Sequence, residues 1–283
     1  MKDTLFYQKK TLNIRGKLLE VGSPMIMGVV NVTPDSFYSG SRARDKEEIL
    51  RMAGTMVLEG ADIIDIGGYS TRPGAEDVSE TEEMNRILPA IELIRHNFKD
   101  VLISVDTFRS NVAREAVNAG AGMINDISGG QLDENMVVTV ARCKVPYVLM
   151  HTRGTPATMK GLTDYQDLIG EIAYYFSARI NILRSAGIAD TLLDPGIGFA
   201  KTVSQNFEIL KNLPYFRIFE LPLVIGVSRK SLIYKTLQIE PKDALNGSTV
   251  LNTIAVLNQA SILRVHDVKA AKEVIRLTNT YLS

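Results

Sequence analysis

Short apolar runs alternate with amphipathic stretches along most of this chain. Eight runs of four to seven residues are rich in Val, Ile or Leu and are almost continuously apolar. Strands of this composition are typical of parallel sheets that are covered on both faces. We therefore predict strands at residues 25–31, 62–66, 101–106, 123–126, 146–151, 191–194, 223–227 and 261–265.

The stretches between these runs have helical periodicity and recognisable ends. One apolar stripe begins at Ile49 and stops at Gly60, a residue that commonly ends a helix. Ser79 and Glu82 have the spacing of a capping box and predict the start of another helix. Strict alternation of strands and helices predicts right-handed crossovers and a parallel sheet.

Eight strand–helix units within about 250 residues fit a closed barrel. We predict an α/β fold, a single (β/α)₈ TIM barrel at residues 1–283 with its core at about 25–275. Residues 5–20 alternate like a small β-hairpin, which we expect at the bottom of the barrel. An open doubly wound sheet is the alternative, but no G-x-G-x-x-G sequence follows the first strand.

Composition narrows the class of protein further. Lys plus Arg and Asp plus Glu both number 32, so a zero formal net charge argues against broad capture of nucleic acid or anionic membranes. No apolar run approaches the ~20 residues of a membrane span, and the first residues do not resemble a signal peptide. Cys143 is the single cysteine, which excludes an intramolecular disulfide. We expect a cytoplasmic protein.

Polar residues follow the predicted strands, and in a barrel these strand ends share one rim, where such enzymes place their chemistry. Asp65, Asp126 and His151, taken singly, are as compatible with turns or helix caps as with a site. The sequence "GIGFAKT" at 196–202 lacks the spacing of a phosphate-binding loop. As a set, two carboxylates, an amide and two cations form the candidate site: Asp106, Asn125, Asp194, Lys230 and Arg264.

Nine phrases in order make the chain closely resemble the dihydropteroate synthase family over about residues 25–275. They are "NVTPDSF", "DIIDIGGYSTRPGA", "SVDTFRSNVA", "INDISGG", "MHTRGTP", "LLDPGIGFAKT", "GVSRKS", "NGSTVLNT" and "LRVHDV". The resemblance implies a transferase of folate biosynthesis that joins 6-hydroxymethyl-7,8-dihydropterin diphosphate to p-aminobenzoate. It also implies Mg²⁺ as cofactor, a homodimer, and inhibition by sulfonamides.

The resemblance assigns pterin binding to the five residues of the candidate site. A carboxylate accepts bonds from a ring N–H and the neighbouring amine at once, which is the role implied for Asp194. The diphosphate-binding residues implied are Asn31, Arg264 and His266, with Asn31 acting as the metal ligand. The implied catalytic residues are Asp35, Lys230, Arg264 and His266.

The second substrate, p-aminobenzoate, requires a narrow apolar pocket. The residues that the resemblance places around it are Phe37, Thr71, Arg72, Pro73, Phe199 and Ser231. Ser231 is expected to open a helix after the seventh strand, where its N–H and hydroxyl would hold the benzoate carboxylate.

Two other functions remain open at this point. A methyltransferase that uses methyltetrahydrofolate and a corrinoid protein would share the carboxylate and the amide side chains that bind the pterin. Asn31, "TPDSF", "STRPG" and "SRKS" argue against it, because they belong to the diphosphate and aminobenzoate parts of the site. A non-catalytic pterin-binding protein is the second alternative, and the presence of Asp35, Arg264 and His266 argues against it.

Overall fold

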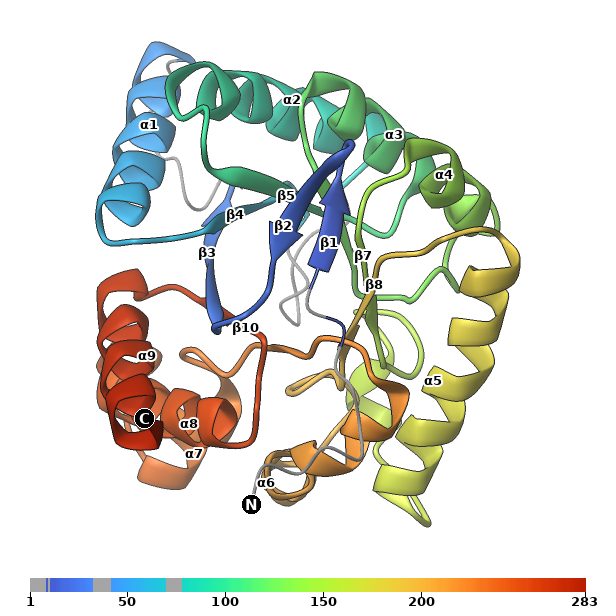
Figure 1. Cartoon of the computed structure of the whole chain (residues 1–283), viewed down its shortest axis with the longest axis vertical. Helices are drawn as coiled ribbons and strands as arrows, with labels where there is room; N and C mark the ends of the chain where they lie inside the picture. The colour runs from blue at the N-terminus through green and yellow to red at the C-terminus, as the bar shows by residue number, and fades with distance from the viewer. Residues whose placement is uncertain (1–8, 10, 33–41, 70–77) are drawn as a thin grey trace.

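The apolar runs form one eight-stranded parallel sheet that curves into a barrel (Figure 1). The computed structural model describes residues 9, 11–32, 42–69 and 78–283. The strand order is β8-β7-β6-β5-β4-β3-β10-β9, and a parallel bridge between Leu193 and Leu223 joins the two ends. The barrel prediction is confirmed, and the open doubly wound alternative is wrong. The strands are β3 (Met25–Asn31), β4 (Ile63–Gly67), β5 (Leu102–Asp106), β6 (Met123–Asp126), β7 (Tyr147–Met150), β8 (Thr191–Asp194), β9 (Val224–Ile225) and β10 (Ile262–Val265).

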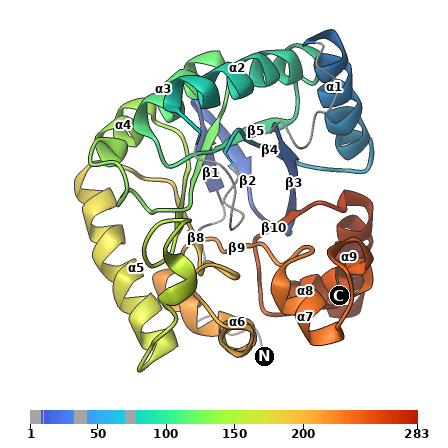
Figure 2. The same cartoon turned by 180° about the vertical axis from the view of Figure 1, so that it is seen from behind.

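Helices surround the barrel, as the two opposite views show (Figures 1 and 2). Ser79 caps the second of them as predicted, because its Oγ accepts the Glu82 N–H at 3.2 Å. None of the described helices has the length and apolar content needed to cross a membrane. The helices are α1 (Arg42–Leu58), α2 (Glu80–Asn97), α3 (Ser110–Ala119), α4 (Met136–Cys143), α5 (Leu168–Ser185), α6 (Val203–Lys211), α7 (Ser231–Leu237), α8 (Leu245–Leu257) and α9 (Val268–Leu282), with 3₁₀ turns at Met159–Gly161, Leu213–Phe219 and Pro241–Asp243.

The strand bounds differ little from those predicted, except at β9. β3, β6 and β8 have the predicted bounds, whereas β9 covers only Val224–Ile225 instead of 223–227. Gly226 follows, and a Cβ placed on it would lie 3.5 Å from Lys230 Nζ and 3.7 Å from Arg264 Cβ. The strand therefore ends where two candidate site residues approach the backbone.

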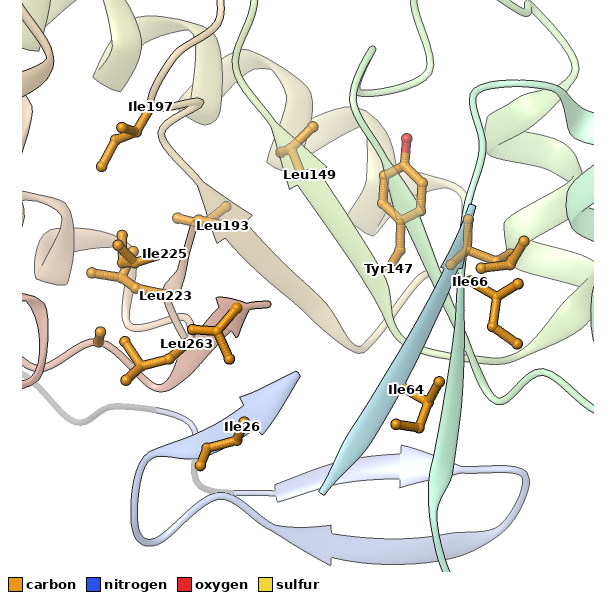
Figure 3. Close-up of a cluster of buried hydrophobic side chains, with 14 of the residues drawn as sticks. Ile26, Ile64, Ile66, Tyr147, Leu149, Leu193, Ile197, Leu223, Ile225 and Leu263 are labelled. Atoms are coloured by element: carbon orange, nitrogen blue, oxygen red, sulfur yellow. The ribbon is translucent and has the colours of Figure 1, made fainter. Parts of the chain in front are cut away.

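Side chains on the strands alternate between two cores, as the pleat of a strand requires. Those that point outward pack beneath the helices, and Figure 3 shows some of them with their loop neighbours, including Ile64, Leu149 and Leu263. Those that point inward come from all eight strands and fill the lower lumen. The buried members of this inner cluster on the strands are Met25, Met27, Ile63, Met123, Val148, Leu192, Val224 and Ile262.

The predicted N-terminal hairpin closes the lower end of the lumen. β1 (Thr11–Ile14) pairs antiparallel with β2 (Lys17–Glu20), and the hairpin lies across the barrel end that faces the viewer in Figure 1. Leu12 is fully buried in the inner cluster, where it covers the apolar ends of the strands. The opposite end of the lumen, at the carboxyl ends of the strands, is therefore the end at which a site can open.

Candidate active site

Strand alternation directs most of the predicted site residues into the lumen. Asn125, Asp194 and Arg264 each lie two residues beyond a member of the inner apolar cluster, so their side chains point to the same side. Asn31 and Asp106 have the same parity, at the ends of β3 and β5. Strands β3, β5, β6, β8 and β10 thus place these five side chains above the apolar floor of the barrel.

Arg264 is the centre of a hydrogen-bonded network in this upper lumen. Its Nε donates to Asp65 Oδ2 at 2.7 Å, and its Nη2 donates to Asp106 Oδ2, also at 2.7 Å. Asn125 Nδ2 donates to Asp65 Oδ2 at 3.0 Å. The three predicted residues Arg264, Asp106 and Asn125 therefore meet, and Asp65 joins them.

Asp65 is the site residue that sequence reasoning did not select. Its carboxylate is fully buried, and Oδ1 has no hydrogen-bond partner among the described residues. The alternation of side chains along β4 could have identified Asp65, because it lies two residues after Ile63, whose side chain points into the lumen. A buried acceptor without a partner is costly unless a ligand N–H satisfies it.

Asp194 and Lys230 form the second part of the site. Asp194 Oδ1 accepts the Gly196 N–H at 2.7 Å, which fixes the carboxylate at the end of β8. Lys230 Nζ donates to the Ile197 carbonyl at 2.5 Å and lies 5.0 Å from the centre of the Phe199 ring. The Asp194 carboxylate and the Phe199 ring thus come from the end of β8 and the loop after it, and the Lys230 ammonium comes from the loop after β9.

Burial and mutual attraction shift the pKa values of these groups in opposite directions. Burial raises the pKa of Asp106 to about 7 and also raises that of Asp194, while Arg264 and Lys230, respectively, oppose those shifts most. Burial lowers the pKa of Lys230 to about 8, against the attraction of Asp194. The pKa of Arg264 is raised, because the attraction of Asp65 and Asp106 outweighs its burial.

His266 follows β10 and is held by the loop after β9. Ser228 Oγ lies 3.1 Å from His266 Nδ1 and accepts the His266 N–H at 3.1 Å. Arg229 and Asp267, which follow Ser228 and His266 in the chain, also interact. The Arg229 guanidinium donates to both Asp267 carboxylate oxygens at 2.9 and 2.8 Å. The loops that carry the predicted pterin and diphosphate partners are therefore tied together.

The remaining predicted residues are only partly described. Ser231 is the first residue of α7, as expected. A Cβ placed on Gly67 would lie 3.7 Å from Asn31 Oδ1 and 3.8 Å from Asp106 Oδ2, so Asn31 adjoins the network. Asp35, Phe37, Thr71, Arg72 and Pro73 lie outside the described residues, and their roles stay predictions.

Two of the polar strand-end residues belong to the outer side of the barrel. Asp126 accepts the N–H groups of Ser128 and Gly130 and the Tyr147 hydroxyl, each at 2.7 Å, so it orders the loop after β6. His151 is buried, and burial followed by the repulsion of Lys201 lowers its pKa to about 2. The side chains of both residues point to the outer side of the barrel, as those of the outer core do, and this explains why they are not in the network.

Comparisons with known proteins agree with this geometry. The family model described as "Pterin binding enzyme" matches residues 27–266. Dihydropteroate synthase from Synechocystis sp. is 46% identical over 257 residues, which cover 90% of this chain and 89% of that protein.

Two solved structures are similar in both sequence and fold. The Yersinia pestis dihydropteroate synthase in complex with a sulfonamide drug has a TM-score of 0.90 and 40% identity, covering 96% of this chain and 99% of that one. The Xanthomonas albilineans dihydropteroate synthase with 4-aminobenzoic acid also has a TM-score of 0.90, with 36% identity, covering 98% of this chain and 99% of that one. The chain therefore belongs to the dihydropteroate synthase family of pterin-binding enzymes.

Proposed function

We propose that this chain is a dihydropteroate synthase, a transferase that condenses 6-hydroxymethyl-7,8-dihydropterin diphosphate with p-aminobenzoate to give 7,8-dihydropteroate and diphosphate. The observation that carries the proposal is the lumen network of Arg264, Asp65, Asp106 and Asn125 beside Asp194 and Lys230. Relatives that are 46% and 42% identical over at least 90% of this chain are dihydropteroate synthases.

The network has the donors and acceptors that a pterin ring needs. Asp194 accepts bonds from a ring N–H and the exocyclic amine, and Asp106 accepts from the far ring nitrogen. Asn125 donates and accepts along the next edge of the ring. Lys230 donates to the ring carbonyl and N5, and the Arg264 plane stacks on the ring. Two groups of the described residues support a site that awaits polar partners: the unpaired Asp65 Oδ1, and the Lys230 ammonium, whose hydrogen bond to the Ile197 carbonyl leaves further donors for a ligand.

The diphosphate leaves toward the rim formed by Arg264, His266 and Asn31. Mg²⁺ commonly binds through one or two protein oxygens together with substrate phosphates. The described residues contain no group of three or more His, Cys, Asp or Glu side chains that could hold a metal ion. The Asn31 amide oxygen at the end of β3 fits such a partial site, and the bound ion would supply positive charge to the departing oxygens.

We assign the condensation to a dissociative, SN1-like route. The C–O bond to diphosphate breaks first, and the methylene cation that forms is delocalised into the pterin ring. Asp35 stabilises this cation, and Arg264 and His266 stabilise the charge on the leaving oxygens. The weakly basic aromatic amine can then attack the methylene carbon without a general base, and the strongly acidic ammonium that forms releases its proton to solvent or to the diphosphate.

The p-aminobenzoate pocket lies beside Lys230. Phe199 forms one wall, and its ring already packs near the Lys230 ammonium at 5.0 Å. Phe37, Thr71 and Pro73 complete the walls, Arg72 orders the loops on closure, and Ser231 holds the benzoate carboxylate. The last assignment is consistent with the position of Ser231 at the start of α7.

The assay that tests this function measures diphosphate release from the pterin substrate, with and without p-aminobenzoate and Mg²⁺. We expect dihydropteroate to form only with both substrates, and chelation of Mg²⁺ to abolish its formation. Formation of methylated corrinoid from methyltetrahydrofolate would instead establish the methyltransferase. Pterin binding without either reaction would establish the non-catalytic binding protein.

We further propose that the enzyme is a cytoplasmic homodimer whose barrel, with its hairpin, is one domain. Apolar side chains on the outer face of α8, at Val250, Ile254 and Leu257, support the dimer because they are exposed at helical spacing. The continuous order of β3 to β10 around one barrel supports the single domain.

A further inference from the structure

The loop after β8 is held from two sides by two lysines, of which Lys201 is buried and Lys230 is partly buried. From the lumen, Lys230 Nζ donates to the Ile197 carbonyl. From the outer side, Lys201 Nζ lies 3.0 Å from the Gly196 carbonyl and 2.9 Å from the Phe199 carbonyl. Lys230 has a role in the proposed reaction, whereas Lys201 has none, and the phosphate-loop interpretation of its sequence already fails on spacing.

Within the described part of the chain, Lys201 is enclosed by hydrogen-bond acceptors and has no carboxylate in direct contact. Only 9% of the residue is exposed. Besides the two loop carbonyls, Nζ lies 3.1 Å from His151 Nδ1 and 3.3 Å from the His151 carbonyl. An ammonium has three N–H donors and no acceptor, so all three find partners here. When Lys201 is charged, its ammonium can only donate to His151 Nδ1, and this favours the neutral ring with its proton on Nε2.

The loop has a backbone that needs such support. Gly196, Gly198 and Ala200 have φ values of +73°, +87° and +50°, in the left-handed region. For Ala200, a residue with a Cβ, this conformation costs on the order of 1 kcal/mol or more. At Gly196 a Cβ would lie 1.9 Å from the His151 carbonyl, so the loop runs against the end of β7.

Two parts of the proposed site depend on this loop. The Gly196 N–H donates to Asp194 Oδ1 at 2.7 Å and thereby orients the Asp194 carboxylate, which is proposed to bind the pterin. The Phe199 ring forms the wall of the aminobenzoate pocket beside Lys230. Lys201 binds the carbonyls of these same two residues, Gly196 and Phe199.

The structure assigns Lys201 as a positioning residue, which anchors the β8 loop to His151 at the end of β7 and thereby sets the geometry of Asp194 and Phe199. The effect on substrates rests on the proposed function, whereas the anchoring of the loop does not. Burial lowers the pKa of Lys201 to about 7, with Asp194 opposing this shift and Lys230 and Arg153 adding to it. The neutral amine has fewer donors than the ammonium, so the anchor is strongest below that pKa.

The decisive variant is Lys201→Met, which keeps an apolar stem but removes the ammonium. Its matched control is Lys160→Met, which removes an exposed lysine outside the loop. Hydrogen exchange of the ligand-free protein should become at least about tenfold faster in residues 195–202 of Lys201→Met, with little change elsewhere. The KM for p-aminobenzoate and the Kd for the pterin substrate should each rise about tenfold or more, because several bonds to a charged group are lost. Lys160→Met should behave as wild type.

His151 provides a second test that keeps Lys201 in place. In His151→Asn the amide oxygen can replace the ring Nδ1 acceptor, whereas the similarly shaped Leu in His151→Leu cannot. We expect faster exchange at 195–202 and a higher p-aminobenzoate KM in His151→Leu than in His151→Asn.

These readouts separate the two proposals. If the wild type does not form dihydropteroate, the proposed function fails, but exchange at 195–202 still tests the anchor. Wild-type exchange and wild-type affinities in Lys201→Met would overturn the assignment. If Lys201→Met does not fold, identical behaviour of His151→Leu and His151→Asn in both readouts would overturn it.

Discussion

The upper lumen holds more carboxylates than cations. Asp65, Asp106 and Asp194 face Lys230 and Arg264, and the repulsion of Asp65 adds to burial in raising the pKa of Asp106. An excess of acceptors suits a ligand whose edge presents several N–H groups. We therefore propose that selectivity for a pterin arises from acceptors, such as Asp65 Oδ1, that the described residues leave incompletely satisfied.

Replacement of Asp194 by Asn tests this principle at one residue. Asn keeps an oxygen for the Gly196 N–H, but it replaces the other acceptor by an NH₂ group that opposes the pterin amine. We expect Asp194→Asn to weaken binding of the pterin substrate by about 1–3 kcal/mol, measured by calorimetry. Asp133→Asn, at a carboxylate that caps the Ser110 N–H, is the control and should bind normally. Unchanged affinity in Asp194→Asn would exclude its proposed role.

The raised pKa of Asp106 predicts a pH dependence of stability. The folded protein retains this proton up to about pH 7, whereas the unfolded chain loses it near the ordinary value of 3.8. The contribution of Asp106 to the free energy of unfolding therefore falls as pH rises through this window, by at most about 1.4 kcal/mol per pH unit. Urea unfolding of wild type and Asp106→Asn from pH 5 to 8 should show the wild type losing stability relative to the variant. A difference that is independent of pH would contradict the shift.

Sequence reasoning found the site residues whose side-chain chemistry is distinctive and missed Asp65 and Lys201. Asp106, Asn125 and Arg264 could be predicted because a carboxylate, an amide and a cation follow parallel strands. Asp65, taken singly, is as compatible with a turn or a helix cap as with a site, and its position two residues after Ile63 on the same strand indicates that it enters the lumen. Lys201 could not be predicted, because its partners are mostly backbone carbonyls whose directions depend on the folded loop.

At the scale of elements, the positions of the site residues depend both on the short strands and on the loops that follow them. β9 has only two residues, yet the loop after it is fixed by Ser228 on His266 and by Arg229 on Asp267. Arg229 has a φ of +54°, and its side chain turns to Asp267 while the neighbouring Lys230 enters the lumen. Apolar periodicity predicts the strands, but these tertiary contacts decide where β9 stops.

The N-terminal hairpin allows a stability prediction at this scale. Leu12 is 0% exposed and covers the floor of the lumen, whereas Leu18 on the same hairpin is 75% exposed. Leu12→Ala should reduce the free energy of unfolding by about 2–5 kcal/mol, because it leaves a cavity in the inner cluster. Leu18→Ala should change it by less than about 0.5 kcal/mol. Urea unfolding measures both, and equal effects would show that the hairpin does not close the barrel as described.

On the scale of the whole molecule, the zero net charge does not indicate where charged and apolar side chains lie. Charged side chains of both signs meet in the upper lumen, while exposed apolar side chains gather on α8 and α9, which pack side by side (Figure 1). Val250, Ile254 and Leu257 occupy one face of α8, and Leu277 and Tyr281 are exposed on α9. Apolar patches of this kind on a folded protein commonly mark an interface.

A charge placed on this face should separate the proposed dimer. Val250 is 51% exposed on α8, and a carboxylate there would have to be desolvated between two copies of the chain. We expect wild type to sediment as a dimer at micromolar concentration and Val250→Glu to sediment as a monomer with a normal circular dichroism spectrum. Val138→Glu is the matched control, because Val138 is 50% exposed on α4, and α4 lies across the barrel from α8 (Figures 1 and 2). A wild type that is monomeric at every concentration, or a Val250→Glu variant that remains dimeric, would show that α8 is not the interface. Since the lumen network lies within one barrel, the monomeric variant should still bind the pterin substrate.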